Sequence, residues 1–220
     1  MRHRSIVATL CAWARGRRQC WRFALAMLPI VIVLAGCGGS SGLTGTDLGH
    51  HPAPDFTLTD QRGQTVRLSA LRGSVVALTF IYTSCPDICP ATAEHFREAY
   101  ARLSAPTRAR VALLAVTVDP ERDDQAALAA FSAQHGLAAN PNWHALGGSR
   151  AALEPIWRAY GVDPGAMVMT PGSPMAAGIS GTLAHTDAVY LIDPQGRERV
   201  LLRSDLDPAA LALDLTELTQ

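Results

Sequence analysis

The chain has 220 residues, 48% of them hydrophobic, which is enough for one domain with a substantial core. Its net charge is zero, but residues 1–36 hold six arginines and no acid, so residues 37–220 carry 13 arginines against 19 acids, a net charge of −6. This balance argues against a nucleic-acid-binding protein, which would show a basic patch, and is compatible with a soluble protein that meets cations.

Residues 1–36 have the character of a bacterial lipoprotein signal peptide. The apolar run FALAMLPIVIVLAG (23–36) follows an arginine-rich stretch and is shorter than the ~20 residues that a spanning helix needs. It leads into LAGC (34–37), which resembles a lipobox whose Cys37 is lipidated and becomes the first residue after cleavage; an uncleaved anchor is the alternative. Either case exports the rest of the chain and attaches it to the outer, periplasmic face of the cytoplasmic membrane. Residues 37–54, rich in Gly, Ser and Pro, are expected to be a flexible tether.

Residues 55–220 are predicted to form one α/β domain. Alternation around turn residues indicates hairpins, β-branched apolar runs indicate buried strands, and helical spacing of apolar residues indicates helices. In chain order the predicted elements are a hairpin (55–71), a buried strand (74–85), a helix (90–104), a second buried strand (109–120), a helix (121–136), a short strand (142–148), a helix with Pro155 inside it (149–161), a long loop (162–182), a second hairpin (188–202) and a final helix (205–218) capped near Asp205 or Asp207.

This order predicts a thioredoxin-like fold. Alternating strands and helices followed by a hairpin and a helix give a mixed sheet with helices on both faces. The N-terminal hairpin precedes the first buried strand, and the long loop precedes the last hairpin. Pro155 predicts a kink or a broken start in its helix.

Export leaves few thiols in the mature domain. Cys11 and Cys20 leave with a cleaved signal peptide, and Cys37 would carry the lipid, so Cys85 and Cys89 remain. A multi-disulfide scaffold is therefore excluded. In an oxidising compartment these two thiols form either one disulfide or a metal site, or they alternate between the two states.

The three residues between Cys85 and Cys89 favour a pincer of two sulfurs. On a helical turn, positions four apart lie on one face, about 6 Å apart. A helix N-terminus lowers thiol pKa values and favours the thiolate, which both attacks disulfides and binds metals. Thiolates select soft metals such as Cu(I), and mixed Cys/His sets suit copper or zinc.

A metal held by two cysteines needs further ligands, and histidine is the natural source. His3 leaves with a cleaved signal peptide, and structural or solvent-facing roles are expected for five others: His50, His51, His95, His135 and His144. His185 differs, because it closes the long loop just before the strand AVYLID, whose start approaches the first helix in a thioredoxin-like fold. Its position alone still favours a structural role.

Three blocks identify a family resemblance. TFIYTSCPDICP (79–90), VTVDPERD (116–123) and AHTDAVYLIDPQGR (184–197) are similar to the motifs of the Sco/SenC family, over roughly residues 52–218. These are membrane-tethered, thioredoxin-fold proteins that assemble copper in cytochrome c oxidase. The resemblance implies that Cys85, Cys89 and His185 bind copper, as Cu(I) or Cu(II). In this reading Asp87 and Asp119 shape the charge of the site without ligating, and a turn or cap role is the alternative for both.

One position departs from the family pattern. Typical members carry an acidic residue directly before the ligand histidine, whereas Ala184 stands here, so a partner that tunes affinity by ~10–100-fold is missing. Asp187 is a possible substitute, although on an extended strand it would point the other way. Three methionines of the long loop offer thioethers suited to Cu(I), but apolar anchoring explains them as readily: Met167, Met169 and Met175.

The leading interpretation is a lipid-anchored copper metallochaperone rather than an enzyme. It would serve the copper-receiving subunit of cytochrome c oxidase or another periplasmic copper or thiol protein. The rival is a thiol–disulfide oxidoreductase, in which one of Cys85 and Cys89 attacks a partner disulfide and the other resolves it. A thiol peroxidase is a weaker third reading, because no arginine lies in TSCPDICP.

Overall fold

The computed structural model describes residues 42–164, 188–203 and 205–220. They form one mixed sheet with the strand order β1-β8-β7-β4-β5-β6-β2-β3. The strands are β1 (Thr46–Asp47), β2 (Thr57–Asp60), β3 (Thr65–Arg67), β4 (Val75–Ile81), β5 (Val111–Thr117), β6 (Trp143–Gly147), β7 (Ala188–Ile192) and β8 (Glu198–Arg203). The helices are η1 (Leu68–Leu71), α3 (Ile88–Arg102), α4 (Ala105–Arg108), α5 (Gln125–Gln134), α6 (Arg150–Ala159) and α8 (Pro208–Leu218).

The middle of the sheet is parallel and its flanks are antiparallel. β4, β5 and β6 run parallel to one another, and β7 and β8 extend the sheet antiparallel beyond β4. On the other side β2 pairs antiparallel with β6 and with β3. All seven residues of β4, VVALTFI, and all seven of β5, VALLAVT, are buried, as expected of strands covered on both faces.

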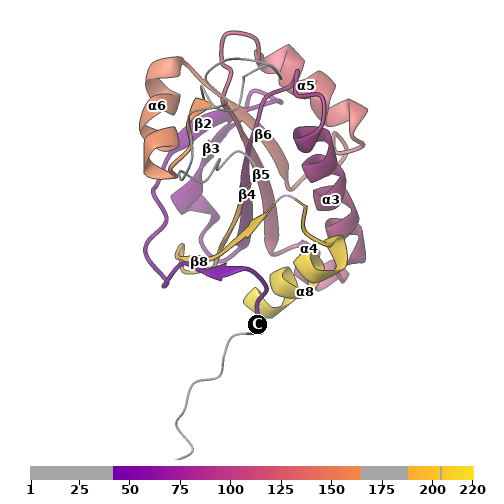
Figure 1. Ribbon diagram of the computed structural model, residues 1–220. Coiled ribbons are helices and arrows are strands. Elements are labelled where there is room, and N and C mark those ends of the chain that lie inside the picture. Colours follow the sequence, from indigo (N-terminus) through magenta and orange to yellow (C-terminus); the bar gives the residue numbers. More distant parts are fainter. Residues whose placement is uncertain (1–41, 165–187, 204) are drawn as a thin grey trace, which may run out of the picture. The chain divides into compact units, whose positions relative to one another are not determined.

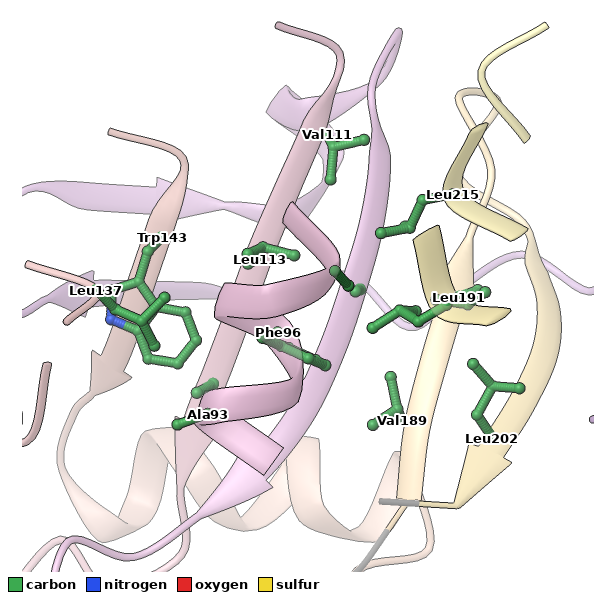
Figure 2. Close-up of a cluster of buried hydrophobic side chains, with 14 of the residues drawn as sticks. Ala93, Phe96, Val111, Leu113, Leu137, Trp143, Val189, Leu191, Leu202 and Leu215 are labelled. Carbon is green, nitrogen blue, oxygen red and sulfur yellow. The ribbon is translucent and has the colours of Figure 1, made fainter. Parts of the chain in front are cut away.

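Helices cover both faces, as Figure 1 shows. On one face α3, α5 and α8 pack on the sheet through a core that includes Phe131. Figure 2 shows Phe96 and Leu215 of the same core. On the other face α6 contributes Leu153 and Trp157 to a second core. The expected thioredoxin-like arrangement of a mixed sheet between helices is confirmed.

Part of the segment expected to be a flexible tether is folded. Residues 46–47 form β1 on β8, Glu198 N–H donates to the His51 carbonyl, and Ala53 N–H donates to the Gly196 carbonyl. Gly45 makes this close packing possible, because its φ is +94° and a Cβ there would meet the Leu201 carbonyl oxygen at 2.6 Å. Composition alone does not reveal these edge pairings, since they depend on β8, about 150 residues away along the chain.

Several element boundaries differ from the sequence prediction. α5 begins at Gln125 rather than at 121, because Asp124 accepts a hydrogen bond from Ala127 N–H and so caps the helix. The structure keeps Pro155 inside a single helix, α6, which Ser149 caps as expected. The cap of α8 is Asp207. In the part of the chain that the structure describes, no helix is both long enough and apolar enough to cross a membrane.

Candidate functional site

The cysteine pair lies where the central strand meets its helix. β4 ends at Ile81 and α3 begins at Ile88, so Cys85 sits in the connecting turn and Cys89 in the first turn of the helix. The turn is closed by a hydrogen bond from Cys85 N–H to the Tyr82 carbonyl, 3.1 Å. Pro90 fits because amides of a first helical turn have no partner within the helix.

Both thiols are free, and they face each other. Cys89 N–H donates to the Cys85 sulfur at 3.3 Å. Cys85 is half-buried, whereas Cys89 is only 2% exposed and belongs to the core under α3. The pair therefore has one sulfur that a partner can reach and one that the fold shields.

The surroundings make the two thiols chemically unequal. A hydrogen bond from the Cys89 thiol, the backbone N–H groups of Asp87 and Cys89, and the Tyr82 hydroxyl together lower the pKa of Cys85 to about 5, against the opposing effect of burial. The hydrogen bond to Cys85, burial and nearby negative charge raise the pKa of Cys89 far above its usual range. At neutral pH Cys85 is thus the thiolate and Cys89 the thiol.

Tyr82 is a site residue that the sequence analysis missed. Burial, with a hydrogen bond to Cys85 and the cysteine charges behind it, raises the pKa of Tyr82 to about 12. The phenol therefore stays protonated and donates to the Cys85 thiolate. Tyr82 stands three residues before Cys85 in the sequence. That position fits the end of an apolar strand equally well, so it does not by itself indicate a site residue.

The two acids expected around the site take different positions. Asp87 is the N-cap of α3, but its exposed side chain makes no capping hydrogen bond; its backbone N–H faces Cys85 instead. Asp119 is buried at the end of β5 and forms an ion pair with Arg122. A third acid, Asp123, was not singled out from the sequence, and its charge acts on Cys89.

His185, Cys37 and the methionines of the long loop lie outside the described residues. Within residues 42–164, 188–203 and 205–220, no three His, Cys, Asp or Glu side chains come together to hold a metal ion. Two sulfurs at one turn are soft donors that suit Cu(I). The two ligands that the described residues supply, Cys85 and Cys89, therefore fit copper.

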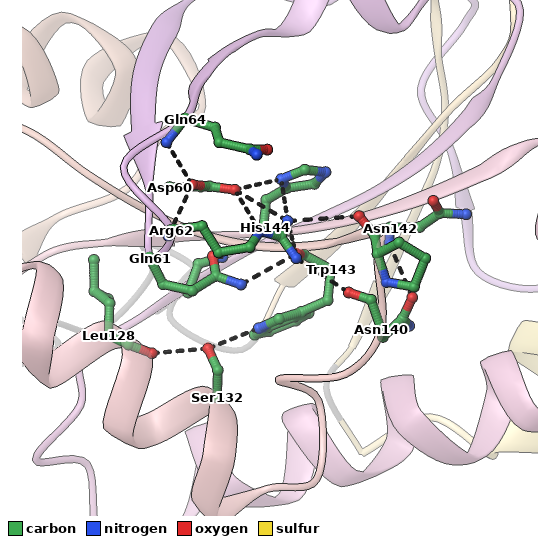
Figure 3. A network of polar contacts seen from close by, with 12 residues as sticks. Asp60, Gln61, Arg62, Gln64, Leu128, Ser132, Asn140, Asn142, Trp143 and His144 are labelled. Atoms are coloured by element: carbon green, nitrogen blue, oxygen red, sulfur yellow. Dashed lines mark hydrogen bonds and ion pairs between the residues drawn. The ribbon is translucent and has the colours of Figure 1, made fainter.

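Two of the described histidines, His144 and His135, make structural contacts away from the cysteine pair. His144 Nδ1 lies 3.0 Å from Asp60 Oδ2, in a polar network with Arg62 at the β2–β6 edge (Figure 3). His135 ends α5 and stacks on Phe131, with ring centroids 4.5 Å apart, and burial lowers the pKa of His135. The expected satisfied role of His144 agrees with this network.

Comparison with known proteins places the chain in one family. A family model described as SCO1/SenC matches residues 45–220. The chain is 34% identical over 143 residues to "Protein SCO2 homolog, mitochondrial" of Bos taurus, covering 64% of this chain and 50% of that protein. It is 28% identical over 153 residues to a "Putative copper-binding protein" of Stutzerimonas stutzeri, covering 70% of each.

A solved structure agrees with these relatives. ScoI of Bradyrhizobium japonicum with copper bound superposes with a TM-score of 0.59 and 28% sequence identity, covering 76% of this chain and 99% of that one. The chain spans about half the length of the mammalian SCO2 proteins that it matches. The fold, the match over residues 45–220 and these relatives together show that the chain belongs to the SCO1/SenC family.

Proposed function

We propose that this chain binds copper as its cargo through Cys85, Cys89 and His185 and passes it to the copper-receiving subunit of cytochrome c oxidase. The observation that carries the proposal is the reduced, convergent pair in which Cys89 N–H donates to the Cys85 sulfur at 3.3 Å. Two similar proteins are linked to copper: the Stutzerimonas stutzeri protein is described as a putative copper-binding protein, and Bradyrhizobium japonicum ScoI was solved with copper bound. His185 supplies the third ligand in this proposal, on the family resemblance alone.

The proposal includes attachment to the membrane. Cys37 is taken as the lipidated residue of an exported protein, on the strength of the LAGC sequence (34–37) and the preceding apolar run. Residues 1–36 are then the signal peptide. A tether ending near residue 42, rather than at 54, joins the anchor to the folded domain, because residues 43–220 form one compact unit.

A second candidate function is thiol–disulfide exchange with a partner protein. The asymmetry of the thiols favours it: the half-buried Cys85 is the thiolate, and the shielded Cys89 is placed to resolve a mixed disulfide. In that reaction the Cys85 sulfur attacks the partner disulfide and one partner sulfur leaves as a thiolate. Cys89 then loses its proton to a partner thiolate and attacks the Cys85 sulfur, the second partner sulfur leaves, and so the partner is reduced and the pair is oxidised.

Copper stoichiometry separates the two functions. The full chain, purified in detergent and reduced, is loaded with Cu(I) and compared with His185→Ala. The Cys85→Ser/Cys89→Ser double variant controls for copper held elsewhere. We expect one copper per chain in excess of the double variant, and an affinity reduced at least ~10-fold in His185→Ala, as for a lost metal ligand or its support. Wild-type protein that holds no more copper than the double variant, yet reduces a model disulfide, would make the chain a reductase.

A further inference from the structure

Asp123 is a buried acid that neither copper ligation nor disulfide exchange uses directly. It is 3% exposed and lies between β5 and α5, just before the α5 cap. Its two carboxylate oxygens each lie 3.1 Å from Thr83 N–H. They also accept from the hydroxyls of Thr83 and Thr117, each at 2.5 Å. Asp123 thereby ties the turn that carries Cys85 to the last residue of β5.

These contacts require two acceptor oxygens. The Thr117 hydroxyl itself accepts from Asp119 N–H at 2.9 Å, so its own hydrogen is donated to Asp123. Thr83 donates through both its N–H and its hydroxyl. An asparagine at this position has one acceptor oxygen and would turn its NH₂ group toward a donor. The arrangement is thus specific for a carboxylate.

Among the described residues, no arginine pairs with Asp123. Arg122 of the same turn pairs with Asp119, so in the described part of the chain only hydroxyl and amide donors satisfy Asp123. A buried charge without an ionic partner is costly. This one lies 3.1 Å from the backbone nitrogen of Thr83, two residues before Cys85.

We propose that Asp123 is a positioning residue of the cysteine site, which fixes the Thr83–Cys85 turn against β5 and supplies a fixed negative charge that favours a cation bound at Cys85 and Cys89. The inference rests on the proposed copper function. It adds that the copper affinity depends on a carboxylate that does not contact the metal, acting through Thr83 and through charge.

The test measures Cu(I) affinity of the full reduced chain by competition with a chromophoric chelator. We expect Asp123→Asn to lower the affinity at least ~10-fold, in the range of lost outer-shell partners. Thr117→Val, which removes one donor to Asp123, should lower the Cu(I) affinity less. Thr117→Ser, which keeps the hydroxyl, should have the wild-type affinity. This series keeps the test informative even if Asp123→Asn folds poorly.

Asp193→Asn is the matched control. Asp193 is also buried and also holds a turn, accepting from the N–H groups of Gln195 and Arg197, but it follows β7 at the opposite end of β4 from the cysteines. The affinity of Asp193→Asn for Cu(I) should equal that of the wild type, whatever the change in the stability of the fold. Equal affinity in wild type and in both Asp123→Asn and Thr117→Val overturns the proposal.

A second readout separates this proposal from the copper function. The fraction of Cys85–Cys89 disulfide is measured at a fixed ratio of reduced to oxidised glutathione. If the wild type binds no copper, the copper function fails. A disulfide fraction changed in Asp123→Asn and unchanged in Asp193→Asn then still supports the positioning role, whereas equal fractions in the wild type and Asp123→Asn overturn it.

Discussion

At the scale of single residues, the site works by making two identical side chains different. Cys85 is half-buried and surrounded by donors, whereas Cys89 is enclosed in the core and loses its proton less readily. The donors come from the start of α3, as the sequence predicts for a helix N-terminus, and from Tyr82, which the sequence did not single out. The sequence motif identifies the two thiols, but the difference between their pKa values depends on how deeply each one is buried.

The pH dependence of Cys85 reactivity follows from these donors. Because the pKa of Cys85 is lowered to about 5, its alkylation by iodoacetamide should already be near its maximal rate at pH 7. Tyr82→Phe removes a hydrogen bond to the thiolate, an interaction worth ~1.5–3 kcal/mol. The midpoint of the alkylation rate should therefore move to higher pH, measured by mass spectrometry on the Cys89→Ser background.

Tyr100→Phe is the control for this prediction. Tyr100 lies at the other end of α3, where its hydroxyl accepts a hydrogen bond from the Asn142 amide at 3.2 Å. Tyr100→Phe should leave the midpoint where the Cys89→Ser background has it. An unchanged midpoint in Tyr82→Phe would show that the phenol does not stabilise the Cys85 thiolate.

At the scale of elements, one buried acid attaches the N-terminal hairpin to the sheet. Asp60 ends β2 with its side chain fully buried, and it accepts from Arg62 and from the N–H groups of Arg62 and Gln64 (Figure 3). His144 on β6 contacts the same carboxylate. The network therefore joins the β2–β3 turn to the strand that β2 pairs with.

Asp60→Ala should destabilise the fold strongly at neutral pH. Removing one partner of a buried ion pair costs about 3–5 kcal/mol, because the others lose their partner. Burial opposes the shift, but hydrogen bonds from Gln64, His144 and Arg62 hold the pKa of Asp60 below its usual range. Because the pKa of Asp60 is lower in the folded than in the unfolded state, its contribution to stability is fully present above the unfolded pKa of about 4. This contribution is lost as the pH falls through the folded pKa.

Urea unfolding at several pH values checks this prediction. The difference in unfolding free energy between wild type and Asp60→Ala should be largest at pH 7 and should shrink below about pH 4. Arg67→Ala, which breaks the exposed pair with Asp55 next to the same hairpin, should cost no more than ~1 kcal/mol. A constant difference between wild type and Asp60→Ala from pH 7 to pH 3 would contradict the assignment.

At the scale of the whole molecule, the sequence predicted the layers better than the contacts between distant segments. The apolar runs of β4 and β5 and the helical spacing of α3 are local signals, and they gave the mixed, doubly covered sheet. The attachment of residues 46–53 to β8 and the turn before it, and the contact of Asp123 with Thr83, are not local. They join residues separated by about 150 positions in one case and by 40 in the other. The periodicity of the sequence therefore does not predict them.

The central place of β4 has a consequence for how cargo binding can be observed. β4 is paired along both edges, by β5 and β7, so its backbone amides should exchange with deuterium only when the whole domain opens. A ligand that binds only the folded chain makes such opening rarer, by ~2.7 kcal/mol at 100 times its dissociation constant. Copper at the cysteine turn should then slow exchange at Val76 through Phe80 about 100-fold, while the amide of Thr46 on the short edge strand β1 keeps its rate. The innermost strand would thus report, through its hydrogens, whether the turn at its end is loaded.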